Sequence, residues 1–341
     1  MGVPIEIYHT ATESFLQKFD SHWNRILKEI DSQQAQLISG NRLRPQICLW
    51  GYLSTVPPCE VHNHNYDQIA NIAVSIELVH KASLLLDDWI DDDNERHGHP
   101  AFHTEHGPEY TVIFALNLIG LSMLRLENIF SNSLVLPQHY NLCLNTLIKT
   151  IYNMAKGAME EIKLKKSEFF NSEKIREIAQ LETAEILGNS MLIGYYFGNE
   201  NNRNQQVEAI FKKIGDQCGY LFQALNDIEA FGNPEGLKIH KGKVNLDFFS
   251  GRKNLAVSSL YQVANKRDQS LLLNATEAEL FDLVKKYKIV ETLREELKVV
   301  YGDILATTTT LQTVGLPLEW CEGFRWFLHQ VKGYAEARLS E

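Results

Sequence analysis

The chain has 341 residues, of which 44% are hydrophobic and 22% are charged, and its formal net charge at pH 7 is −10. These proportions are those of an ordinary globular protein and exclude a disordered or fibrous one. The negative balance also argues against nucleic acid as a partner, because affinity for a phosphate backbone comes from clustered lysine and arginine. An anionic substrate would need a local cationic pocket or a bound metal.

Apolar residues recur at three- and four-residue spacing along most of the chain, which predicts helices. The expected helices cover residues 19–30, 69–86, 110–130, 140–162, 175–197 and 207–231. The lysine-rich segment 162–170 is interpreted as a solvated helix end. The connection 232–254 contains glycine, proline and several lysines, and is long enough to form a lid or a binding loop. We therefore predict an all-α fold and a single domain over residues 1–341.

The cysteines and the lengths of the apolar segments indicate where in the cell the protein is expected. The five cysteines are scattered and never form a CxxC pair, so a disulfide framework or a zinc cluster is not expected. They fit a reducing compartment, and we expect a cytoplasmic protein. We expect no signal segment and no transmembrane segment, because no window approaches the ~20 apolar residues that a membrane span requires.

The stretch LLLDDWIDDD places five aspartates within seven positions at the end of an apolar run. If residues 82–92 are helical, Asp87 and Asp91 lie one turn apart on one face, with Asp88 beside Asp87 and Asp92 one turn beyond Asp88. Carboxylates at this spacing indicate a bound cation, and oxygen ligands favour magnesium over zinc. Since magnesium completes its shell with phosphate, the cluster predicts a diphosphate ligand above an apolar cavity. A solvated acidic helix end is the alternative interpretation.

Five segments resemble, in their order and spacing, the motifs of the trans-isoprenyl diphosphate synthase (polyprenyl synthetase) family. Their sequences are SGNRLRP (39–45), ELVHKASLLLDDWIDDDNERHGHP (77–100), LETAEIL (181–187), GYLFQALNDIEAF (219–231) and KGKVNLDFFSGRKN (241–254). They are similar to the family's GGKRLRP element, its first aspartate-rich motif with RRGKP, its KT pair, its second metal motif FQxxDDxxD and the lysine-bearing loop that follows. The resemblance extends along nearly the whole chain. It implies a helical bundle around a central apolar cavity and a homodimer.

The same resemblance implies the chemistry and the residues that perform it. An allylic isoprenyl diphosphate would lose its diphosphate to leave a carbocation, with up to three Mg²⁺ ions between the two metal motifs. The implied metal ligands are Asp87, Asp88, Asp91, Asn226 and Asp227, of which the first three would be catalytic together with Lys243. The implied diphosphate-binding residues are Arg96, Lys243, Lys253 and Gln223 for the allylic substrate, and Arg44 and His80 for isopentenyl diphosphate.

Ala82 and Ser83 stand four to five residues before the first aspartate, where the family controls tail length. Both are small, so they leave the expected tail pocket open and permit a tail of C15 or longer. Close packing between helices explains small residues equally well.

The sequence departs from the family among the phosphate-binding residues. Asn41 stands where the family has a lysine, and His97 stands where it has a second arginine. Losing two charge-assisted hydrogen bonds costs roughly 3–6 kcal/mol, or about two to four orders of magnitude in affinity. Glu182 replaces the lysine of the KT pair and puts a like charge near the expected allylic diphosphate. In the second metal motif, Ala230 offers no oxygen ligand.

We therefore predict a magnesium-dependent prenyltransferase that ionises an allylic isoprenyl diphosphate of C15 or longer. Because the isopentenyl site is eroded, we expect a non-standard prenyl acceptor, such as an aromatic ring, an indole or a peptide side chain. Three alternatives stay open: a terpene synthase on the same scaffold, an ordinary chain-elongating polyprenyl diphosphate synthase, and a catalytically weak regulatory subunit of a prenyl synthase.

Overall fold

The computed structural model describes residues 5–30, 35–38, 40–96, 98–131, 137–165, 172–199, 203–232 and 254–340. Nearly all of these residues are helical, which confirms the predicted all-α class. Strands β1 (Glu95–Arg96) and β2 (His99–Pro100) form a short antiparallel hairpin, in which Arg96 pairs with His99.

The helices account for most of the described residues. In chain order they are α1 (Ile5–Glu29), α2 (Ala35–Ile38), α3 (Leu43–Leu53), η1 (Val61–Asn63), α4 (Asp67–Ile90), α5 (Phe102–His106), α6 (Pro108–Ser131), α7 (Pro137–Lys165), α8 (Ser172–Ala179), η2 (Gln180–Ala184), α9 (Glu185–Gly198), α10 (Gln205–Gly232), α13 (Leu255–Val263), α14 (Lys266–Leu272), α15 (Glu277–Lys286), α16 (Ile289–Thr313) and α17 (Leu318–Ser340).

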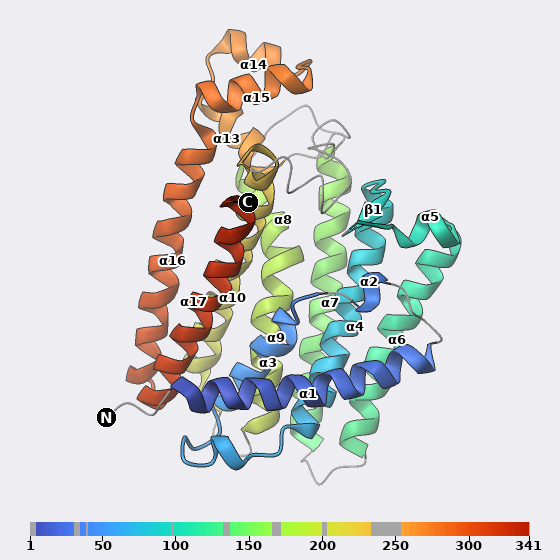
Figure 1. Ribbon diagram of the computed structural model, residues 1–341, viewed down its shortest axis with the longest axis vertical. Coiled ribbons are helices and arrows are strands. Elements are labelled where there is room, and N and C mark those ends of the chain that lie inside the picture. The colour runs from blue at the N-terminus through green and yellow to red at the C-terminus, as the bar shows by residue number, and fades with distance from the viewer. Residues whose placement is uncertain are drawn as a thin grey trace.

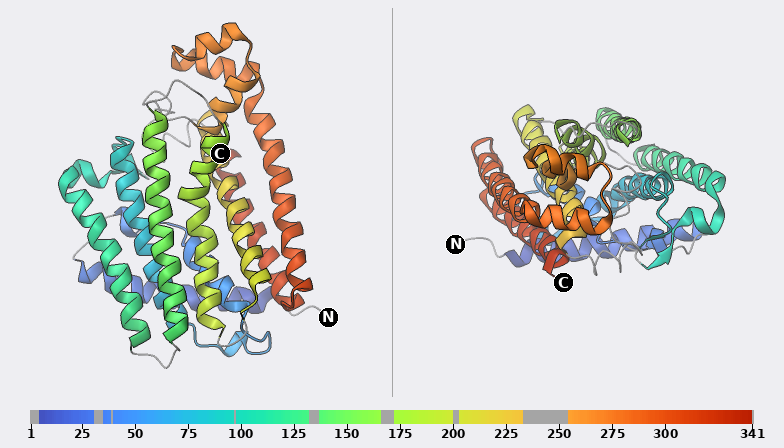
Figure 2. Two further views of the ribbon diagram at one scale, coloured as in Figure 1. Left: turned by 180° about the vertical axis from the view of Figure 1, so that it is seen from behind. Right: turned by 90° about the horizontal axis from the view of Figure 1, so that it is seen from above.

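The long helices lie side by side along the longest axis of the molecule, and α1 crosses them near one end (Figure 1). Helices α14 and α15 lie at the opposite end, as both further views show (Figure 2). Helices α4 and α7 run toward that same end before they stop. The first aspartate-rich motif therefore lies at the end of the bundle where α7 also ends. The last turn of α7 contains Lys163 and Lys165.

Helix α9 is the centre of the bundle, since every residue in 185–197 is buried. Helix α3 packs on it without a layer of side chains between the backbones. A Cβ atom at Gly51 would lie 1.9 Å from the carbonyl oxygen of Met191, and one at Gly194 would lie 1.9 Å from that of Cys48. Each helix thus supplies a glycine where the other comes closest.

Helix α10 approaches the same central segment in the same way. A Cβ atom at Gly215 would lie 2.2 Å from Cα of Gly188, and one at Gly219 would lie 2.3 Å from Cα of Ala184. These distances exclude any larger residue without a shift of the backbone. Helices α3 and α10 are therefore both held against α9 by direct backbone approach.

The segment 175–197 is not the single α-helix that its periodicity predicts. Helix α8 is followed by one π-helical turn, η2, before α9 begins. A π turn adds a residue to the helical repeat and changes the direction in which the following side chains point. The turn contains Glu182 and Thr183, in the segment that resembles the KT motif.

In the part of the chain that the structure describes, two helices, α4 and α6, are long and apolar enough to cross a membrane by length and composition alone, so the expectation about apolar windows is wrong. Such a test is also passed by the core helices of soluble proteins. The apolar window of α4 is 72% buried in the bundle, as in a core helix, whereas that of α6 is 28% buried. Helix α6 therefore presents an apolar face that the described residues leave largely exposed.

Candidate active site

The first aspartate-rich motif lies where α4 ends. Asp87 and Asp88 belong to the helix, but α4 stops at Ile90, and Asp91 forms its C-cap. Asp92 has a left-handed backbone with φ of 54° and an exposed side chain. The expected helix is thus two residues too long, and Asp92 is not stacked one turn beyond Asp88.

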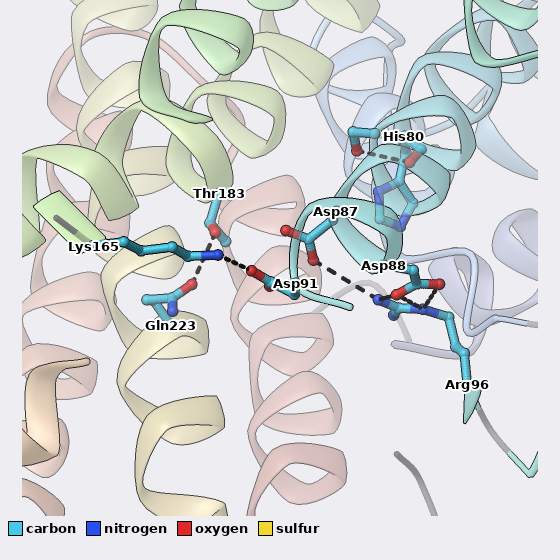
Figure 3. A network of polar contacts seen from close by, with 9 residues as sticks. His80, Asp87, Asp88, Asp91, Arg96, Lys165, Thr183 and Gln223 are labelled. Carbon is cyan, nitrogen blue, oxygen red and sulfur yellow. Dashed lines mark hydrogen bonds and ion pairs between the residues drawn. The ribbon is translucent and has the colours of Figure 1, made fainter. Parts of the chain in front are cut away.

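Arg96 folds back from the β1–β2 hairpin onto this motif. Its Nε donates to both carboxylate oxygens of Asp88 at 2.8 Å, and its Nη2 also contacts Asp88 and lies 3.8 Å from Oδ2 of Asp87 (Figure 3). Burial opposes the charge of Arg96, but the bonds to Asp88 outweigh it and raise the pKa of the guanidinium. Arg96 therefore lies at the motif with a carboxylate as its partner, and its role as a ligand of the allylic diphosphate stays a prediction.

Lys165, the last residue of α7, reaches the same motif from the opposite side. Its Nζ lies 2.5 Å from Oδ1 of Asp91, and both side chains are largely buried (Figure 3). The interpretation of residues 162–170 as a solvated helix end is therefore wrong for Lys165. Sequence reasoning missed this residue because no spacing signal links positions 74 residues apart.

The second metal motif is held together by hydrogen bonds. Gln223 donates from Nε2 to Oδ1 of Asp227 at 2.9 Å and accepts a bond of 3.3 Å from the hydroxyl of Thr183. The backbone N–H of Leu255 donates to Oδ2 of Asp227 at 2.7 Å. Asp227 is consequently buried with both oxygens engaged, whereas Asn226, the other predicted ligand in this motif, is exposed.

Glu182 faces the second metal motif. It lines a pocket together with Gln223 and Asp227, and Glu161 of α7 lines the same pocket. A Cβ atom at Gly157 would lie 2.6 Å from Cγ of Glu182, so the glycine on α7 leaves room for the Glu182 stem. Glu182 thus lies at the second metal motif, and Glu161 adds a second carboxylate that the sequence did not reveal. That Glu182 lies beside a bound diphosphate stays a prediction.

Arg44 and His80 lie close together two turns before the aspartates of α4. Arg44 Nε is buried without a hydrogen-bond partner, and burial lowers the pKa of its guanidinium to about 10. Burial, with Arg44 and Lys81 as the next contributors, lowers the pKa of His80 well below its ordinary value. His80 is therefore neutral at pH 7, and the predicted isopentenyl site keeps a cation and a neutral imidazole.

Further cations surround this pair. Arg42 Nη1 lies 3.3 Å from Oε1 of Glu77, and its guanidinium stacks over the rings of Phe19 and Trp23. Lys81 Nζ lies 3.9 Å from the same oxygen of Glu77. Burial lowers the pKa of Lys81 to about 8. A buried group of positive side chains thus lies beside the first metal motif.

The departures from the family are only partly visible. Asn41 is exposed, and its Oδ1 accepts a hydrogen bond of 3.1 Å from the backbone N–H of Leu43, at the start of α3. Three further positions lie outside the described residues, and the predictions made for them stay predictions. These are His97, Lys243 and Lys253. The side chain of Ala230 lies outside them as well.

The two small residues proposed for tail length lie within α4. Ala82 is fully buried in the hydrophobic core, and Ser83 is half-buried and donates from its hydroxyl to the backbone oxygen of His80 at 2.8 Å. Ala82 therefore has a packing role in the bundle. The role of both residues beside a tail pocket stays a prediction.

The aspartates are suitable ligands for magnesium, because their carboxylate oxygens are the hard donors that this ion prefers. Among the described residues, no group of three or more histidine, cysteine, aspartate or glutamate side chains converges closely enough to hold an ion. Asp88 is engaged by Arg96, and Asp91 by Lys165. A metal ion would therefore have to take these two carboxylates from their cationic partners.

Known proteins of similar sequence are synthases of isoprenyl diphosphates. The geranylgeranyl pyrophosphate synthase of Capsicum annuum chloroplasts is 27% identical over 56% of this chain, and that match spans 50% of the plant enzyme. The geranylgeranyl diphosphate synthase of Methanosarcina mazei is 22% identical over 76% of this chain and 80% of its own length.

A solved structure shares the fold, and a family model matches most of the chain. The polyprenyl synthase of Caulobacter crescentus, complexed with calcium and isoprenyl diphosphate, aligns over 100% of this chain and 98% of its own with a TM-score of 0.76 and 18% identity. The model of the polyprenyl synthetase family matches residues 26–293. The matched segment includes both metal motifs and the Arg44–His80 pair. The chain is therefore a member of the polyprenyl synthetase family.

Proposed function

We propose that the protein is a prenyl diphosphate synthase of the geranylgeranyl type, which lengthens an allylic isoprenyl diphosphate with isopentenyl diphosphate. The observation that carries this proposal is the second cationic site. Arg44 lies with the neutral His80 and with other buried cations next to the first metal motif, where a second diphosphate is required for elongation. The ordinary synthase is thereby favoured over the non-standard acceptor that the substitutions at Asn41 and His97 suggested.

The relatives support the same choice. Those of Capsicum annuum and Methanosarcina mazei are both named as geranylgeranyl diphosphate synthases. A terpene synthase or an enzyme with an aromatic acceptor would have no use for a second diphosphate site. An excess of buried positive charge at Arg44 would then be a cost without a function.

In the proposed reaction, the bond between C1 and the oxygen of the allylic diphosphate breaks, and the electron pair leaves with the diphosphate. The double bond of isopentenyl diphosphate attacks the resulting cation, and loss of a proton yields the longer allylic diphosphate. Gln223, oriented by Thr183, lies at the second motif, where it can donate to the leaving diphosphate. Arg44 would hold the second diphosphate in place.

Magnesium is the proposed cofactor. Asp87, Asp88 and Asp91 would hold it from α4, and Asp227 from α10, while Arg96 and Lys165 would turn from the carboxylates to phosphate oxygens. When bound, the ion would neutralise the charge that develops on the leaving diphosphate. The family resemblance implies up to three such ions.

One incubation tests the proposal. The purified protein is given Mg²⁺ and dimethylallyl, geranyl or farnesyl diphosphate, with and without isopentenyl diphosphate, and the products are separated by chain length. We expect longer diphosphates ending near C20 and only when isopentenyl diphosphate is present. A cyclic hydrocarbon formed without it would select the terpene synthase, and no turnover with any allylic substrate would favour the regulatory subunit.

We also propose a homodimer that buries the apolar face of α6. Ile113, Leu116 and Leu124 are each more than half exposed and recur at helical spacing, with Gly120 between them. Helix α7 lies beside α6 and adds Tyr152, which is 66% exposed (Figure 2). Exposed apolar side chains that gather on one face of a helix in this way mark a contact with another chain.

A further inference from the structure

The cluster around Arg44 and His80 contains a lysine to which the family resemblance assigns no role. We infer that Lys81 binds the diphosphate of the second substrate together with Arg44, and so provides the cation that is missing at Asn41. The inference rests on the proposed function, in which isopentenyl diphosphate occupies this site.

The first argument is charge. Arg42 and Lys81 approach one carboxylate oxygen, that of Glu77, at 3.3 and 3.9 Å. Arg44 makes no ion pair with any residue that the structure describes. Asp20, also 3.7 Å from Arg42, is more than half exposed and therefore screened by water. Among the described residues, positive charge thus exceeds buried negative charge, which is costly unless an anion binds.

The second argument is the position of the ammonium. A Cβ atom at Gly40 would lie 3.4 Å from Lys81 Nζ, so the ammonium rests against the loop that leads into α3. That loop carries Asn41 and ends at Arg42, the N-cap of α3, two residues before Arg44. Lys81 also precedes Asp88 by seven residues, which places it on the same face of α4, about 10 Å along the helix axis. The ammonium therefore lies against the loop, and its residue is on the face of α4 that also carries Asp88.

The third argument is that Asn41 is engaged elsewhere. Its side chain accepts the N–H of Leu43 and is exposed, so it contributes to the start of α3. The contact between Lys81 and Glu77 is too long for a hydrogen bond. Because the lysine stem is flexible, its ammonium can turn toward an anion bound at Arg44. A charge lost from one side of the loop is thereby supplied from α4.

Steady-state kinetics of Lys81→Met test the inference. Removing one charge-assisted hydrogen bond is expected to raise the KM for isopentenyl diphosphate about 10- to 100-fold. The KM for the allylic diphosphate should stay within about twofold. In the double variant Lys81→Met/Asn41→Lys, the lysine returns at the other side of the loop, and the KM for isopentenyl diphosphate should fall back to within roughly threefold of the wild-type value. Lys81→Arg should keep most of the affinity.

Lys298→Met is the matched control, because Lys298 also pairs with a glutamate of its own helix but is 65% exposed on α16. It should change neither KM. An unchanged KM for isopentenyl diphosphate in Lys81→Met would overturn the inference, and so would an equal rise for both substrates that Asn41→Lys does not reverse.

If the wild type makes no longer diphosphate, the proposed function fails, and binding still decides the role of Lys81. Calorimetric titration with isopentenyl diphosphate and with inorganic pyrophosphate would then compare the wild type with Lys81→Met. Weaker binding by the variant supports the inference, and equal binding overturns it.

Discussion

The ammonium of Lys165 lies 2.5 Å from a carboxylate oxygen of Asp91, although the two residues come from the ends of different helices, α7 and α4. Both side chains are largely buried, so the pair is shielded from water. The third aspartate of the motif that is proposed to hold magnesium is thus paired with a lysine. The protein supplies its own counter-ion to this motif, as it does at Asp88 through Arg96.

Lys165→Met is expected to make the protein depend more strongly on magnesium. Without its cation, the buried Asp91 carboxylate destabilises the metal-free fold, so the melting temperature in a chelator should fall. The carboxylate no longer has to leave a partner, so Mg²⁺ should bind about 10-fold or more tightly. Thermal melting against Mg²⁺ concentration measures both effects. Lys163→Met, which removes a 72% exposed lysine of the same helix, should change neither.

Asp87 and Asp88 are expected to differ in their effect on stability. Asp87→Asn changes a side chain that is 43% exposed and should leave the denaturation midpoint nearly unchanged. Asp88→Asn leaves Arg96 buried without its carboxylate and should cost about 3–5 kcal/mol. Both should lower kcat at least about 100-fold, since each removes a metal ligand. Urea denaturation and turnover assays measure the two quantities, and full activity of Asp87→Asn would remove its role as a ligand.

Glu182→Gln is expected to tighten binding of the allylic diphosphate. The substitution removes a negative charge from the pocket that Gln223 and Asp227 line. A single like charge close to the diphosphate is worth about 1 kcal/mol or more, so the KM should fall about fivefold or more. Glu177→Gln, on the exposed face of α8, serves as the control. A higher KM would mean that Glu182 supports the site, for example by holding an ion.

The charge of Lys81 is expected to lower stability at neutral pH. The charged and titratable groups that face it are Glu77 and His80 on α4, Arg42 and Arg44 at the start of α3, and Arg96 on β1. Burial lowers the pKa of Lys81 from 10.5 to about 8. The unfolded chain therefore holds this proton more tightly, and the stability of the wild type rises with pH between about 8 and 10.5.

Lys81→Met should consequently be more stable than the wild type at pH 7, by an amount on the order of 3 kcal/mol. The advantage should shrink as the pH rises from 8 toward 10.5. Urea denaturation of both proteins at pH 7, 8, 9 and 10 measures it. A variant less stable than the wild type at pH 7 would show that Lys81 serves the fold as a partner of Glu77.

The double variant Leu116→Glu/Leu124→Glu is expected to separate the dimer. Both side chains lie on the exposed apolar face of α6, so the carboxylates would be desolvated in an interface and exposed in a monomer. The dissociation constant should rise at least about 100-fold, as measured by sedimentation or light scattering. Val299→Glu changes a residue of α16 that is also exposed, and it should leave the dimer intact. A wild type that is monomeric at micromolar concentration would contradict the proposal.

Helix periodicity predicted the bundle well, because apolar residues at three- and four-residue spacing must face a core. The segment expected at 207–231 became α10 (Gln205–Gly232), which differs by two residues at one end and one at the other. The π turn at Gln180–Ala184 was not predictable, because the same apolar spacing fits an uninterrupted α-helix. The end of α4 at Ile90 was missed for a similar reason, since a run of aspartates gives no stop signal.

The site was predicted where it is local in sequence. The resemblance placed Arg96 beside the aspartates of α4, only eight residues from Asp88. Lys165 and Lys81 were missed because their roles depend on which helices pack together. The expectation of a non-standard acceptor also ignored the packing of the helices. It compared each position with the family motif and counted a lost cation at Asn41 and at His97. A charge absent from Asn41 can be supplied by another part of the fold.

The close approach of α3 and α10 to α9 has a consequence for motion. With glycines at the crossings, neither helix can slide on α9 without a backbone clash, so the three should exchange their amide hydrogens as one slow unit. Arg44 at the start of α3 and Asp227 on α10 would then keep a fixed separation while substrates enter and leave. If the site opens, the segments that move would be those without such close backbone packing. They include the end of α4 and the hairpin that carries Arg96.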